Sequence, residues 1–138
     1  MIQQNEISKL LKATLTSTTN FKGVSISLLS KLGNQLITIT TTTEDQLKIY
    51  SLIAYNSVAS TNLEWNIIEF NELKCIIQKI SNNDNSIDSN DEEELTYYVT
   101  LFYLNSSNDN GDDGDAIAKL KVDNLSKTLK DGLKGYVN

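Results

Sequence analysis

The sequence of 138 residues contains no histidine, no proline and no arginine, and it has a single cysteine. Histidine is the usual general base of enzymes and the commonest metal ligand, so its absence disfavours catalysis and excludes Ser-His-Asp and Cys-His arrangements. The absence of arginine removes the bidentate clamps that hold phosphate groups. We therefore expect a protein that is not an enzyme, with no catalytic residues, no cofactor and no metal site.

The single cysteine, Cys75, excludes an internal disulfide framework and fits a cytosolic chain. It lies in the apolar run 73–77, which is typical of a β-strand. A thiol in such a place is either a reactive nucleophile or a buried, inert side chain. The apolar neighbours favour the buried thiol.

The charge of the chain is acidic, with 12 lysines against 18 aspartates and glutamates and a net charge of −6. Nucleic acids and anionic membranes attract basic patches, so this balance disfavours direct binding to either. No apolar run approaches the roughly 20 residues needed to cross a bilayer, and we expect no direct membrane insertion. Any membrane location would then come through a partner protein.

Two stretches, 81–94 and 105–115, are rich in asparagine and acidic residues and are predicted to be solvated loops. The second invites comparison with an EF-hand calcium loop, in which Asp109 and Asp113 would fit ligand positions. Leu120, however, stands where that motif needs a bidentate carboxylate. A solvated acidic loop is therefore favoured over a calcium site.

The apolar pattern predicts one domain over residues 1–138, built from three helices and five strands. Helices are expected at 5–17, at 44–61 and from 116 onward, and strands around 24–28, around 36–39, and at 65–70, 73–80 and 95–104. Helix, two strands, helix, three strands and helix is an order typical of the α/β (α+β) class, with one antiparallel sheet whose halves are joined by a helix. The run at 95–104 has the strongest β-propensity and should be a central strand.

The helix predicted at 44–61 has two apolar faces rather than one. One stripe holds Leu47, Tyr50, Ala54 and Val58, and the other holds Ile49, Leu52, Ile53 and Ala59. A helix on a sheet needs only one apolar face, so the second lies either in this chain's own core or in a subunit interface. In so small a domain we favour the interface. Replacing Ile53 or Tyr50 with aspartate should then weaken dimerisation.

The strand predicted at 65–70 has Glu69 as its only charged residue and could lie at an edge of the sheet. Such an edge is poorly protected against pairing with another strand. Neighbouring loops could cover it, but the adjacent two-faced helix favours a dimer that joins two sheets. The predicted dimer interface comprises Leu47, Ile49, Tyr50, Ile53, Ala54, Val58, Trp65, Ile67, Ile68 and Phe70.

The order of elements resembles that of the roadblock / dynein light-chain family over nearly the whole chain. The stretches ISKLLKATL at 7–15, KIYSLIAYNSV at 48–58 and IIEFNELKCIIQKI at 67–80 are most similar to the roadblock-type subunit of the fungal EGO complex, the counterpart of a subunit of the animal Ragulator scaffold. The resemblance implies the roadblock fold, with sheet order 2-1-5-4-3, the middle helix on one face and the terminal helices on the other. It also implies that two subunits pair through the middle helix and the third strand, giving a continuous ten-stranded sheet.

The same resemblance implies partners and a location. The partners are a roadblock-type subunit (as a hetero- or homodimer), a lipidated anchoring subunit and Rag-family GTPases. Such an assembly lies on the cytoplasmic face of the vacuolar membrane and couples amino-acid supply to the TOR complex. Two alternatives are an adaptor of a dynein motor with the same fold and an acidic, calcium-responsive domain.

Overall fold

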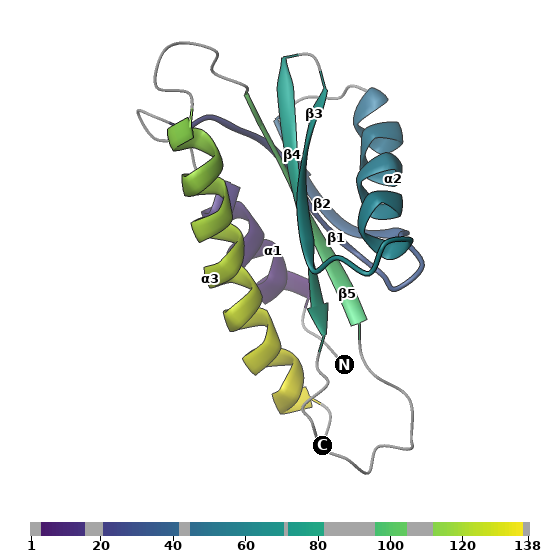
Figure 1. Ribbon diagram of the computed structural model, residues 1–138. Coiled ribbons are helices and arrows are strands. Elements are labelled where there is room, and N and C mark those ends of the chain that lie inside the picture. The colour runs from purple at the N-terminus through teal and green to yellow at the C-terminus, as the bar shows by residue number, and fades with distance from the viewer. Residues whose placement is uncertain are drawn as a thin grey trace.

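The computed structural model describes residues 4–15, 21–41, 45–70, 72–81, 96–104 and 112–136, which hold three helices and five strands in the predicted order (Figure 1). In chain order they are α1 (Gln4–Leu15), β1 (Gly23–Leu29), β2 (Gln35–Thr40), α2 (Gln46–Ala59), β3 (Trp65–Phe70), β4 (Leu73–Ser81), β5 (Thr96–Leu104) and α3 (Asp112–Tyr136).

The five strands form one sheet in the order β2-β1-β5-β4-β3, and every neighbouring pair is antiparallel. This confirms the predicted fold class and strand order. β5 is the central strand, as its aromatic and β-branched residues predicted, and all but two of its side chains are buried. The edges of this sheet are β2 and β3.

The helices form one layer on each face of the sheet: α2 covers one face, and α1 and α3 cover the other (Figure 1). Because side chains alternate along a strand, each face has its own core. The core beneath α1 and α3 is centred on Leu11, Ile26 and Leu101, and the core beneath α2 includes Ala54 and Phe102. The predicted placement of the middle and terminal helices is thus confirmed.

Most element boundaries differ from the prediction by one to four residues, and three of the differences involve α2 and the predicted loops. α2 begins at Gln46 and ends at Ala59, two residues inside each predicted end. Ser81, predicted to open a loop, is the last residue of β4. α3 begins at Asp112, so residues 112–115 belong to a helix and not to the predicted acidic loop. The remainder of the two predicted loops, 82–94 and 105–111, lies outside the described residues.

Asp115 ties the start of α3 to the sheet. Both of its carboxylate oxygens lie 3.1 Å from the Nζ of Lys74 on β4, and the hydroxyl of Tyr103 on β5 donates a hydrogen bond of 2.8 Å to one of them. Burial and the adjacent carboxylate raise the pKa of Tyr103, so its hydroxyl stays protonated and remains a donor. The carboxylate of Asp115 therefore joins the first turn of α3 to both β4 and β5.

The β1–β2 hairpin is held against the C-terminal half of α2. The hydroxyl of Tyr55 donates a hydrogen bond of 2.8 Å to the backbone oxygen of Lys31. Gly33 has a φ of 91°, and a Cβ added there would lie 2.8 Å from the ring of Tyr55. Only glycine fits both the backbone conformation and the close ring at this turn.

Candidate interaction surface on α2 and β3

One face of α2 holds the helix to its own sheet. Leu47, Ser51, Ala54 and Val58 recur every three or four residues and are all buried, with Ala54 fully so. Leu47, Ala54 and Val58 belong to the predicted dimer interface. Their side chains pack in this chain's own core with Phe102, so they present almost no surface to a partner.

The opposite face of α2 is apolar and exposed. Ile49, Leu52 and Ile53 have 58%, 52% and 46% of their surface exposed. The second predicted stripe therefore lies outside the core of the described chain, and the interpretation of α2 as a helix sunk in its own core is wrong. Large apolar side chains gathered on one exposed helix face are typical of a surface that another protein covers. We call Ile49, Leu52 and Ile53 the outer face of α2.

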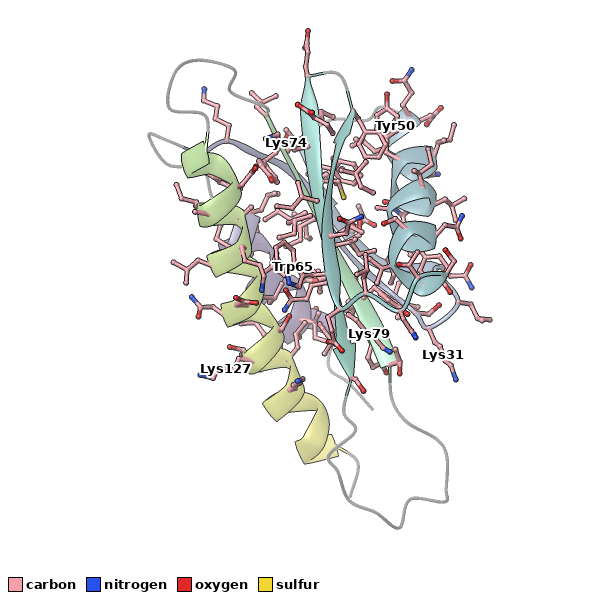
Figure 2. All side chains as sticks on the ribbon, viewed as in Figure 1. Lys31, Tyr50, Trp65, Lys74, Lys79 and Lys127 are labelled. Atoms are coloured by element: carbon pink, nitrogen blue, oxygen red, sulfur yellow. The ribbon has the colours of Figure 1, made fainter. Side chains whose placement is uncertain are left out.

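Tyr50 connects the outer face of α2 to the edge strand β3. Its ring points toward β3 (Figure 2) and stacks on Phe70, with 4.2 Å between ring centroids and 16° between ring planes. Tyr50 and Phe70 are both half-buried. A second contact between the two elements is a hydrogen bond of 3.2 Å from the amide of Asn66 to the hydroxyl of Ser57. α2 and β3 thus present one continuous surface.

β3 is paired on one side only. Within the described residues it is hydrogen-bonded to β4, in a register that runs from Trp65 opposite Gln78 to Phe70 opposite Leu73. Backbone N–H and C=O groups at a free edge are available to another strand. This confirms the predicted edge position of 65–70.

The side chains of β3 alternate between the two faces of the sheet. Ile68 and Phe70 pack with the core beneath α2, whereas Ile67 packs with the core beneath α1 and α3. Trp65, which is 41% exposed, also points toward α3 (Figure 2), where the Nζ of Lys119 lies 4.7 Å from its ring centroid. Trp65 and Ile67 therefore do not share a surface with the outer face of α2, although they were predicted in the same interface.

An ion pair fixes Lys119 above Trp65. Its Nζ lies 2.6 Å from Asp123, one helical turn further along α3. Partial burial raises the pKa of Asp123, but hydrogen bonds from Lys119 and Gln78 outweigh that effect, and the pKa is lowered. The carboxylate stays ionised, which keeps Lys119 in place.

Three residues that the predicted interface left out also contribute to this surface. Leu52 is as exposed as its neighbours on the outer face, and its place in the second apolar stripe was the signal. Glu64 and Glu72 flank β3 at its two ends, and both are exposed. Both lie just outside the strand, and within 65–70 the only charged residue is Glu69.

Groups suited to chemistry lie apart from this surface. Cys75 is fully buried in β4, which confirms the predicted buried thiol, and burial raises its pKa. Within the described part of the chain, no three His, Cys, Asp or Glu side chains are grouped so that they could hold a metal ion. No helix there is long and apolar enough to cross a membrane.

The sequence matches no protein-family model and no curated protein. The structure, by contrast, is similar to solved structures over nearly its whole length. A structure described as MglB with tetrameric arrangement covers 95% of this chain and 90% of its own, with a TM-score of 0.65 and 10% identity. A Roadblock/LC7 domain from Streptomyces avermitilis covers 91% of this chain and 96% of its own, with a TM-score of 0.57 and 9% identity.

The chain has the roadblock fold. This confirms the fold that the sequence resemblance implied. A third structure, the gliding protein MglB from Thermus thermophilus, agrees, with a TM-score of 0.67, 10% identity and coverage of 95% and 90%. At such low identity the likeness shows a shared roadblock architecture, and the residues of α2 and β3 must be judged on their own chemistry.

Proposed function

We propose that this roadblock-fold chain is a non-catalytic scaffold subunit that pairs with a second roadblock-type chain through α2 and β3. The observation that carries the proposal is the exposed apolar outer face of α2 beside the unpaired edge of β3. A helix packed on the outer face would bury apolar surface, and a strand added to β3 would satisfy its free backbone groups. A standard interface buries roughly 1,600 Å² in total, which two helices and two edge strands can supply.

We further propose that the pair belongs to an EGO- or Ragulator-like complex that recruits Rag-family GTPases and couples amino-acid supply to the TOR complex. The support is the resemblance of 7–15, 48–58 and 67–80 to the EGO subunit, together with the roadblock fold. In this proposal a lipidated subunit holds the complex on the cytoplasmic face of the vacuolar membrane. This chain contributes a rigid surface, and the GTPases supply the chemistry.

Affinity purification from the cell of origin, followed by mass spectrometry, tests the proposal. The tagged wild-type chain should recover a second roadblock-type chain and a small GTPase. An Ile49→Asp bait should lose both, because aspartate on the outer face of α2 would be buried without a partner charge in the complex. A Leu120→Asp bait is the matched control, since Leu120 is 61% exposed on α3 and lies on the other face of the sheet.

Three outcomes separate the possibilities. Recovery of a dynein intermediate chain in place of GTPases would favour the motor adaptor. Equal recovery of partners by the wild-type and Ile49→Asp baits would contradict the proposed surface. Loss of partners with Leu120→Asp but not with Ile49→Asp would move the interface to the face of α1 and α3.

A further inference from the structure

We infer that the free edge of β3 selects a partner of opposite charge and disfavours pairing with a second copy of this chain. The inference rests on the proposed pairing through α2 and β3 and specifies the partner. Glu64 precedes β3, Glu69 lies within it and Glu72 follows it, and all three are exposed. Residues 63–72 contain no lysine, so both ends of the edge are acidic.

Self-pairing along the full length of β3 brings acidic ends together in both strand directions. In an antiparallel dimer, Glu64 of each copy approaches the end that carries Glu69 and Glu72 in the other copy, and twofold symmetry repeats this contact. In a parallel dimer, each glutamate approaches its own equivalent. Like charges directly opposite each other on neighbouring strands destabilise the pairing. The acidic flanks therefore oppose self-association.

The nearby lysines offset these charges only in part. Lys74 lies opposite Glu69 in the register of β3 and β4, but its Nζ is also bound to Asp115. Lys79 lies on β4 beside Glu64, and its backbone N–H donates a hydrogen bond of 2.9 Å to the backbone oxygen of Glu64. Both lysines are on the inner strand β4, whereas Glu69 is on the edge strand and Glu64 and Glu72 flank it. A third lysine, Lys119 on α3, lies over Trp65 and is paired with Asp123.

The partner that fits is a different chain of roadblock fold with lysine or arginine at both ends of its edge strand. Exposed ion pairs are individually weak, so the apolar outer face of α2 would supply most of the affinity. Charge would then decide which chain pairs, because acids meeting acids reject one partner and acids meeting bases accept another.

Sedimentation equilibrium with the full-length chain tests the inference. The probe is a charge-reversed variant, Glu64→Lys/Glu72→Lys, carrying a fluorescent label and mixed with unlabelled wild-type chain. At about 50 mM salt, the mixed dimer should form with a Kd on the order of tenfold lower than that of the wild-type self-dimer. At about 500 mM salt, screening should remove most of this preference, and wild-type self-association should tighten.

Two single substitutions that change the net charge by the same amount, Glu72→Lys and Glu6→Lys, provide the control. Glu72→Lys should show part of the preference for wild-type chain, and Glu6→Lys, an exposed position on α1, should show none. A wild-type self-dimer whose Kd is insensitive to salt, with no preference in the mixture, would overturn the inference. An absence of any dimer in the mixture at either salt would also overturn it.

The Ile53→Asp variant distinguishes a failure of the charge-selection inference from a failure of the proposed pairing through α2 and β3. If a salt-insensitive self-dimer is lost in Ile53→Asp, selection by charge is wrong but pairing through α2 stands. If that self-dimer persists in Ile53→Asp, both the charge selection and the proposed surface are wrong. If no dimer forms, the recovery of partners by the wild-type and Ile49→Asp baits decides whether α2 is an interface.

Discussion

Replacing Ile53 with aspartate should abolish pairing while leaving the fold intact. Ile53 is 46% exposed on the outer face of α2, so the new carboxylate stays in water in the free chain. The free energy of unfolding should therefore change by less than about 1 kcal/mol. In a dimer the same carboxylate would be buried without a partner, at a cost of about 3 kcal/mol or more, and the Kd should rise at least about 100-fold.

Multi-angle light scattering over a range of concentrations measures this effect, at high salt where the charges beside β3 are screened. Thermal unfolding followed by circular dichroism checks the fold in parallel. Leu120→Asp is the control, because it introduces the same charge at an exposed leucine of α3. If Ile53→Asp dimerises with the Kd of the wild-type chain, the outer face of α2 is not the interface.

Replacing Ala54, the residue after Ile53, with aspartate should destroy the fold. Ala54 has 0% of its surface exposed and faces the core beneath α2. An aspartate at this position must bury its carboxylate among apolar side chains or displace α2 from the sheet. The expected loss is about 4 kcal/mol or more, comparable with the whole stability of a small domain, which is roughly 5–15 kcal/mol.

Urea titration followed by circular dichroism measures that loss, with Ile53→Asp as the matched control on the adjacent residue. The two variants should differ in opposite ways: Ala54→Asp loses stability, and Ile53→Asp loses only association. If Ala54→Asp had the same free energy of unfolding as the wild-type chain, Ala54 would not pack between α2 and the sheet. A large loss of stability in Ile53→Asp would show that the outer face is part of the core.

The fold was predictable because each element carries a clear apolar period. The strand order followed from the resemblance and not from the periodicity, which cannot say which strands are neighbours. The two stripes of α2 were visible in the sequence, but period alone does not tell which stripe faces the sheet. The structure shows that the inner face carries Leu47 with the smaller Ser51, Ala54 and Val58, while Ile49, Leu52 and Ile53 face outward.

The start of α3 could not be predicted, because it depends on tertiary contacts with the sheet. Residues 111–115 contain two glycines and three aspartates, which are poor helix formers, so they were predicted to be a loop. The contacts of Asp115 with Lys74 and Tyr103 hold the helix start to the sheet, and these partners are distant in the sequence. The acidic first turn is also favoured by the partial positive charge at a helix N-terminus.

The division of β3 between two faces is predictable from the sequence. Side chains of a strand alternate, so Trp65 and Ile67 must lie on one face and Ile68 and Phe70 on the other. A strand paired to the edge of β3 would meet side chains of both faces, but only Ile68 and Phe70 lie on the face that α2 covers. The corrected surface joins the outer face of α2 to the backbone edge of β3, with Tyr50 and Phe70 between them.

Amide hydrogen exchange of β3 is the most direct test of this surface. The backbone N–H groups of Trp65–Phe70 that do not bond to β4 should exchange quickly in the monomeric Ile53→Asp variant. In the associated wild-type protein those same groups should become protected, together with the amides around the outer face of α2. Unchanged exchange in β3, with new protection confined to α1 or α3, would show that the partner binds elsewhere.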